Sequence, residues 1–215
     1  NTLAVTRGIQ AALPAIRAQL PGDAQLDVLY DRGDYIGASV EDVEWTLLGS
    51  LLLVIVVILL FLRSWMATLI VALALPTSLI GTFAVMRLLH FSLDNISMLA
   101  LTLSVGFVVD DAIVVIENIV RHAEQGASRM DAAIAATQEI GFTVLSMTLS
   151  LSAVFLPIVF MGGLVGRLFS EFGMVISIAV ILSGIVSLTL TPMLASRWLD
   201  PKKSAGWVFE RFDRL

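Results

Sequence analysis

Long apolar runs separated by short polar segments occupy the chain from about residue 39 onward. A helix needs about 20 consecutive apolar residues to cross the hydrocarbon core of a bilayer, and five of the runs reach that length. We expect these helices at about 39–62, 66–89, 93–122, 129–160 and 164–198. The pattern predicts an all-α polytopic membrane bundle whose two ends lie on opposite sides of the membrane.

Two of the expected helices begin with recognisable capping residues. Ser39, which two acidic residues follow closely, resembles the start of a capping box, and acidic side chains also favour the positive end of the helix dipole. Ser128 and Asp131 form a similar start before the fourth helix. We therefore expect the first membrane helix to begin near Ser39, after a polar connection over 31–38.

The chain before residue 39 has the pattern of a small soluble unit. Apolar residues recur at helical spacing through residues 1–20, and the Pro21-Gly22-Asp23 cluster should end that helix. Residues 25–30 then alternate as in a short strand. A helix and a single strand cannot bury a core of their own, so residues 1–38 are interpreted as the short, incomplete α/β end of a larger extramembrane domain.

The chain after residue 198 changes character again. Aromatic and charged residues alternate along 199–215, and Val208, Phe212 and Leu215 share one helical face. This pattern predicts a C-terminal amphipathic helix on the membrane surface. A disordered linker is the alternative for this segment.

Composition agrees with a membrane location and excludes several other classes. Hydrophobic residues make up 58% of the 215 positions and charged residues 14%, with a mean hydropathy of +0.93. There is no cysteine and no basic cluster of the kind that binds nucleic acid. No nucleophile elbow, phosphate loop or metal-binding constellation is found, so we expect neither an enzyme nor a bound cofactor or metal. The chain starts at Asn1 without a methionine or signal peptide, and we expect it to be a piece of a longer protein.

The third apolar run carries two adjacent aspartates, Asp110 and Asp111. Ser97, Ser104, Asp111 and Asn118 recur every seven residues, so on a helix they form one polar seam that must face protein or water. Asp110 lies about 100° around the helix from Asp111 and can therefore address a different neighbour. A carboxylate near the middle of a bilayer costs at least about 2.5–3.5 kcal/mol, and such residues usually mark ion or proton pathways.

The aspartates lack a basic partner inside the apolar parts of the predicted spans, because lysine and arginine are absent from 47–62, 66–86, 93–119, 140–161 and 173–190. A compensating cation would have to come from outside this chain. Without one, we expect at least one aspartate to be protonated at neutral pH, and a group that is alternately paired and protonated can couple proton passage to helix movement. Two other interpretations stay open: a structural buried pair, and a site for Na⁺ or another cation.

Charges in the short loops predict how the bundle is oriented. Near one membrane surface, Glu117 lies four residues before Arg121, and a local ion pair between them is expected.

Basic residues are concentrated on one side of the membrane, which the positive-inside rule assigns to the cytoplasm; they are Arg63, Arg121, Arg129, Arg197, Lys202 and Lys203. The other side has Arg87 and Arg167. The N-terminal end is therefore expected outside the cytoplasmic membrane and the C-terminal end inside the cell.

Several motifs resemble one known family. Gly106-Phe-Val-Val-Asp-Asp-Ala-Ile-Val-Val-Ile-Glu-Asn118 is similar to the fourth transmembrane helix of the resistance-nodulation-division exporters, in the multidrug (hydrophobe/amphiphile) branch of Gram-negative bacteria. Further similarities to the second to sixth helices of that family occur in order along the chain, at Phe61-Leu-Arg-Ser64, Pro76 with Gly81-Thr-Phe-Ala84, Ala153-Val-Phe-Leu-Pro157, Gly162-Gly163 with Gly166-Arg167, and Leu188-Thr-Leu-Thr-Pro192.

The resemblance implies a proton-driven multidrug efflux pump of the bacterial inner membrane, trimeric and with twelve helices per subunit. It implies a drug/proton antiporter that works with a periplasmic adaptor protein and an outer-membrane channel. By the same resemblance, residues 1–38 end a periplasmic porter subdomain, and Asp110 and Asp111 are the proton-relay residues, with their basic partner elsewhere in the transporter. Asn1-Thr-Leu-Ala-Val-Thr6 is most similar to pumps whose trimers mix two related subunits. A heavy-metal exporter, and a sterol-sensing or protein-translocation relative, remain alternatives, although the second aspartate favours drugs over metal ions.

Overall fold

The computed structural model describes residues 2–22, 26–28, 32–62 and 64–199, and these residues form helices and no strand. In chain order the helices are α1 (Thr2–Arg17), α2 (Arg32–Leu62), α3 (Trp65–Leu88), α4 (Asn95–Glu124), α5 (Arg129–Val159) and α6 (Gly163–Trp198). Five of them are long and apolar enough to cross a membrane, the first over Glu41–Leu62 and the others over the whole of α3 to α6. The prediction of an all-α bundle with five membrane helices is confirmed.

The chain divides into two units, Asn1–Thr46 and Leu47–Leu215, which are described separately. In the first unit, α1 agrees with the amphipathic helix predicted before Pro21. The predicted strand is wrong for its described part, because residues 26–28 form no strand. A strand is stable only when a partner strand pairs its backbone N–H and C=O groups, and the described residues offer no such partner.

The start of α2 differs from its prediction. The helix begins at Arg32, so Ser39 lies inside it and the expected polar connection is largely helical. A capping sequence allows a helix to begin but does not stop one that is already formed. Because residues 32–38 contain no proline, the helix can continue through them.

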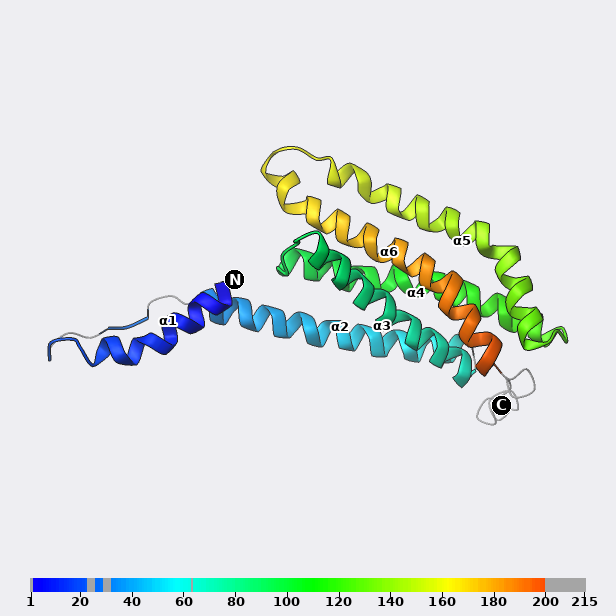
Figure 1. Cartoon of the computed structure of the whole chain (residues 1–215), viewed down its shortest axis with the longest axis horizontal. Coiled ribbons are helices and arrows are strands. Elements are labelled where there is room, and N and C mark those ends of the chain that lie inside the picture. Colours follow the sequence, from blue (N-terminus) through cyan, green and yellow to red (C-terminus); the bar gives the residue numbers. More distant parts are fainter. Residues whose placement is uncertain (1, 23–25, 29–31, 63, 200–215) are drawn as a thin grey trace. The chain divides into compact units, whose positions relative to one another are not determined.

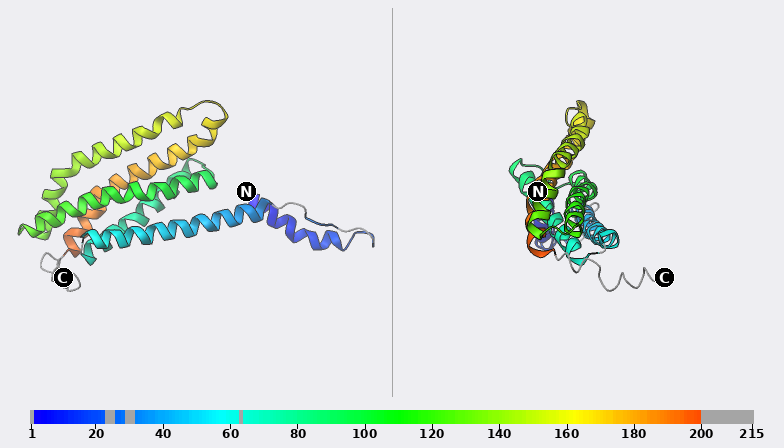
Figure 2. Two further views of the ribbon diagram at one scale, coloured as in Figure 1. Left: turned by 180° about the vertical axis from the view of Figure 1, so that it is seen from behind. Right: turned by 90° about the vertical axis from the view of Figure 1, so that its right-hand side faces the viewer.

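The second unit is a bundle in which α6 packs against α3, α4 and α5, while α4 also packs against α3 and α5 (Figure 1). The turns from α3 to α4 and from α5 to α6 lie at one end of the bundle, and the turn from α4 to α5 lies at the other (Figures 1 and 2). The core contains mostly small and β-branched side chains, which let the helices approach closely; examples are Ala67, Val71, Ala112, Val115, Ala136 and Ala179.

Helix boundaries in this unit follow from local chemistry. Ser64 and Ser128 are the N-cap residues of α3 and α5, and each side chain accepts a backbone N–H of its first turn. The turn before α6 needs glycine for two reasons: Gly163 has a φ of +79°, and a Cβ on Gly166 would lie 1.8 Å from the Met161 carbonyl oxygen. The predicted C-terminal amphipathic helix lies outside the described residues, apart from Leu199.

Candidate functional site

The polar seam predicted on the third membrane helix is buried within α4. Ser97 and Ser104 are completely buried, and Asp111 and Asn118 are 4% and 7% exposed. Each serine hydroxyl is satisfied close to its own position, since Ser97 completes the N-terminal capping box and Ser104 donates to the Leu101 carbonyl. Asp111 lies near the middle of α4, which extends from 95 to 124. Asp111 is the ionisable side chain of the seam, and it therefore lies near the middle of the predicted bilayer.

Two neighbouring helices approach the Asp111 carboxyl with hydroxyl groups. The hydroxyls of Ser183 on α6 and Thr148 on α5 are the ones that lie beside it. Ser183 also donates to the Val108 carbonyl over 2.9 Å, which ties α6 to α4 less than one turn before Asp111. The Oδ2 atom of Asp111 is fully enclosed and makes no hydrogen bond with any described residue. A carboxyl group is therefore held among neutral polar groups with part of its hydrogen-bonding capacity unused.

The contact between α5 and α6 beside Asp111 depends on a glycine. A Cβ on Gly184 would lie 2.6 Å from Thr148 Oγ1 and 3.1 Å from Thr148 Cγ2, closer than real Cβ contacts. Gly184 follows Ser183 directly, so one short segment of α6 provides both a hydroxyl for Asp111 and the space that Thr148 needs. The close approach of two helix backbones at a small residue is typical of membrane bundles.

The two adjacent aspartates have different environments. Asp111 is buried inside the unit, whereas Asp110 is exposed on its surface. Asp110 is the charged group that acts on Asp111, and the ion pairs found among the described residues involve neither aspartate. Because the two side chains point about 100° apart around α4, Asp111 lies inside the bundle and Asp110 lies on its surface.

A second polar cluster joins α4 to α5 near the end of both helices. Arg121 Nη2 lies 2.6 Å from Glu139 Oε1, and His122 Nε2 lies 2.7 Å from Glu139 Oε2. The expected pair between Glu117 and Arg121 is therefore wrong in the described structure. Instead of a pair within α4, Arg121 and His122 both contact the Glu139 carboxylate on α5. Spacing along one helix does not reveal a contact between two helices.

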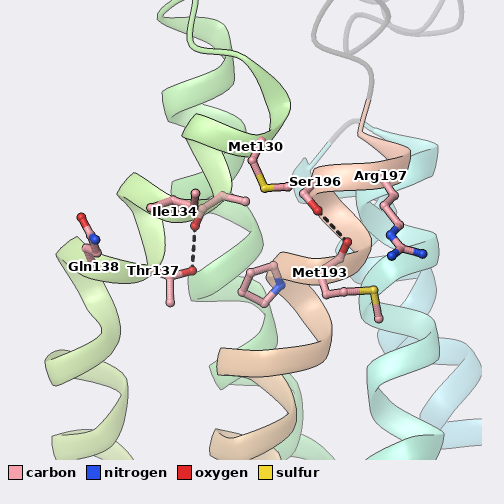
Figure 3. A pocket seen from close by; sticks show the side chains of 9 residues that line it. Met130, Ile134, Thr137, Gln138, Met193, Ser196 and Arg197 are labelled. Atoms are coloured by element: carbon pink, nitrogen blue, oxygen red, sulfur yellow. Dashed lines mark hydrogen bonds between the residues drawn. The ribbon is translucent and has the colours of Figure 1, made fainter.

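A cavity of about 420 Å³ lies elsewhere, between α5 and α6 (Figure 3). Figure 3 shows Thr137 and Ser196 at its wall, where both hydroxyls donate to carbonyls of their own helices. Arg197 lines it from the last turn of α6. Its lining contains no carboxylate, so we place the candidate site at Asp111 rather than here. Within the described residues no group of three or more histidine, aspartate or glutamate side chains could hold a metal ion.

Sequence reasoning identified Asp110 and Asp111 but missed the side chains that surround them. Thr148, Ser183 and Gly184 lie far from Asp111 in the chain and belong to other helices. One pattern could have indicated the face of α6, because Ser183, Ser187 and Thr191 recur every four residues in an apolar run and all are buried. Nothing in the sequence distinguishes Thr148 from the other hydroxyl residues of α5.

Five apolar helices, one of which carries a buried carboxyl group near its middle, define a multi-pass membrane protein with a protonatable group inside the bundle. Comparison with known proteins gives the family. Residues 1–215 match the AcrB/AcrD/AcrF family, and the chain belongs to it.

Several similar curated proteins are described as multidrug resistance protein MdtC. The protein from Pectobacterium atrosepticum is 55% identical over 206 residues, which is 95% of this chain and 20% of that protein. Those from Pectobacterium carotovorum and Salmonella newport are each 54% identical, over 206 and 203 residues, or 95% and 94% of this chain and 20% of each relative. The chain spans about a fifth of the length of the curated relatives it matches.

Proposed function

We propose that this chain is a membrane segment of a proton-driven multidrug exporter, and that Asp110 and Asp111 on α4 form its proton relay. The burial of Asp111 near the middle of a membrane helix is the observation that carries the proposal. Membership of the AcrB/AcrD/AcrF family supports it. The relatives are described as multidrug resistance proteins, which favours drugs over metal ions as the exported substrates.

The physical basis of the relay is the unequal cost of the two protonation states. A buried carboxylate without a cation is costly, and a protonated carboxyl is much less so. A basic group on another part of the transporter would reverse this preference when it moves close to the pair. Asp110 is exposed on the surface of the unit and is available for that contact. Proton uptake and release would then follow the movement of helices past α4.

The proposal includes the assembly and orientation that the family resemblance implies. The full transporter would be a trimer in the bacterial inner membrane and would work with a periplasmic adaptor protein and an outer-membrane channel. The turn from α4 to α5, which Arg121 and Arg129 flank, would face the cytoplasm, because basic residues at the membrane surface favour that side. The turn from α5 to α6 would then face the periplasm, together with the N-terminal unit.

Substitution of Asp111 tests this function. The experiment uses a transporter that contains this chain and is as long as the relatives. Asp111→Asn keeps the shape of the side chain but cannot exchange a proton. We expect cells with this variant to retain a fluorescent lipophilic dye as strongly as cells without the transporter, while membrane content and trimer assembly stay normal. Glu117→Gln, on an exposed position of the same helix, is the matched control and should export dye normally. Normal dye export by Asp111→Asn would refute the relay.

A further inference from the structure

Hydroxyl side chains in this bundle commonly bond to their own helix. Serine and threonine residues on α3 to α6 donate to the carbonyl four residues earlier, which satisfies a hydroxyl without a neighbouring helix; examples are Thr68, Ser78, Thr82, Thr102, Thr137, Ser152, Ser177 and Thr189. Thr148 on α5 and Thr191 on α6 are different, because the Oγ1 atom of each is buried and forms no hydrogen bond with any described residue. Of the two, Thr148 lies beside Asp111.

Thr148 is also confined to one place. Gly184 on α6 lies so close that a Cβ there would meet both branches of the threonine side chain, at 2.6 Å and 3.1 Å. The Asp111 carboxyl also lies beside Thr148, and its Oδ2 is likewise buried and unbonded. The two unsatisfied atoms of this region therefore belong to neighbouring side chains, and unsatisfied buried polar groups call for an explanation.

We propose that Thr148 is a positioning residue for the Asp111 carboxyl, and that Gly184 provides the space that holds the Thr148 hydroxyl against it. The inference rests on the proposed relay and deepens it. When Asp111 is ionised, the Thr148 hydroxyl donates to Oδ2. When Asp111 is protonated, the same hydroxyl accepts the carboxyl proton, because a hydroxyl can do either. The threonine thus stabilises both states at one fixed position, and a small shift of α5 along α6 strengthens or weakens that contact.

Few other charges act at this position. Asp110 is the titratable neighbour on α4 itself. The described titratable side chains on α5 and α6 lie at least nine residues along their own helix from Thr148 or Ser183, and the one on α3 lies in its last turn. They are Arg87 on α3, Arg129, Asp131 and Glu139 on α5, and Arg167, Glu171 and Arg197 on α6. A hydroxyl beside the carboxyl therefore has a large influence on the protonation of Asp111, and the effect of removing it should be measurable.

The test measures protonation of Asp111 directly in the purified transporter of full length. A hydrophobic carbodiimide reacts with protonated carboxyl groups, and tandem mass spectrometry locates the adduct on Asp111 and not on Asp110. Thr148→Val keeps the shape of threonine and removes the hydroxyl. We expect the midpoint of labelling against pH to move to higher pH by about one unit, because the hydrogen bond to the ionised carboxylate is stronger than the one to the neutral carboxyl by about that much. The pH profile of dye export should move in the same direction.

Two controls separate the hydroxyl from packing. Thr148→Ser retains the hydroxyl, and its midpoint should stay near that of the unmodified protein. Thr137→Val removes a half-buried hydroxyl from the same helix, one that donates to the Ala133 carbonyl, and should leave the midpoint unchanged. If Thr148→Val does not reach the membrane, Thr148→Ala replaces it with the same expected shift.

The possible results are clear. An unchanged midpoint in the variant without the hydroxyl overturns the inference, and so does an equal shift in Thr148→Ser, because packing would then be the cause. The labelling result does not depend on transport. If the midpoint shifts as expected but Asp111→Asn still exports dye, the contact is real and the proposed relay is wrong. If Asp111→Asn is inactive and the midpoint is unchanged, the relay stands without Thr148.

Discussion

The two polar clusters on α4 differ in burial and in charge pairing. Around Asp111 a single carboxyl is buried, with neutral hydroxyl groups from α5 and α6 beside it. Around Glu139 a carboxylate is half exposed and meets two basic side chains of α4, Arg121 and His122. The first cluster has a buried ionisable group without a counter-charge, and the second has opposite charges in contact with solvent.

The difference shows that a close ion pair need not contribute more to stability than a buried carboxyl group without a counter-charge. Exposed ion pairs are screened by water and usually contribute little to stability. A buried carboxyl with unused hydrogen-bonding atoms is sensitive to every neighbouring dipole, because the surrounding dielectric constant is low. We therefore expect substitutions near Asp111 to have large effects and substitutions at the ion pairs to have small ones. The following predictions are ordered by that expectation.

The largest effect is expected from Gly184→Ala. The added methyl group would overlap Thr148, and overpacking of this kind costs about 1–3 kcal/mol. Thermal unfolding of the purified transporter in detergent should show lower stability, and dye export should fall sharply. Combining the change with Thr148→Ala removes the overlapping atoms and should restore stability but not the position of the labelling midpoint. Failure of the double substitution to recover stability would show that the glycine is required for another contact.

An intermediate effect is expected from Asn118→Ala, one level further along the polar seam. Asn118 Nδ2 donates to the Ala136 carbonyl on α5 over 3.3 Å, and both residues are buried. Loss of a neutral hydrogen bond should lower the free energy of unfolding by about 1 kcal/mol. Thermal unfolding in detergent measures it. Dye export should remain, since the residue is distant from Asp111; a loss of export equal to that of Asp111→Asn would extend the relay along the seam.

The smallest effect is expected from Glu139→Gln. The glutamine keeps one oxygen that can accept from Arg121, and its amide N–H can donate to Nε2 of a neutral His122, so both contacts can persist while the charge is lost. The unfolding temperature should change less than it does for Asn118→Ala, and the remaining difference should shrink further as salt is added, because salt screens exposed charges. A larger loss than that of Asn118→Ala would reverse the comparison between the two clusters.

Much of the membrane bundle could be predicted from the sequence. Runs of apolar residues longer than the bilayer is thick leave few alternatives to helices, because every backbone polar group must be satisfied inside the segment. The seven-residue recurrence from Ser97 to Asn118 likewise predicted one buried face of α4, and the structure buries all four of its members. The roles of Asp110 and Asp111 in proton transfer stay a prediction.

Other features were not accessible in this way. The strand expected over 25–30 is absent from its described residues, because pairing with other strands decides whether an alternating segment becomes one. Arg121 pairs with a carboxylate on α5, where the spacing along α4 indicated Glu117. In both cases the local pattern was compatible with the prediction, and a contact from another segment, present or missing, decided the outcome.

The sequence by itself thus determined that the chain forms five membrane helices and that one of them carries a costly pair of carboxyl groups. Periodicity and composition are sufficient for this, since both act within a single helix. Only the tertiary structure decided which aspartate is buried, and that Thr148, Ser183 and Gly184 surround it. These residues meet because α5 and α6 pack against α4 in one particular register, and the register follows from the shapes of many side chains rather than from any short motif.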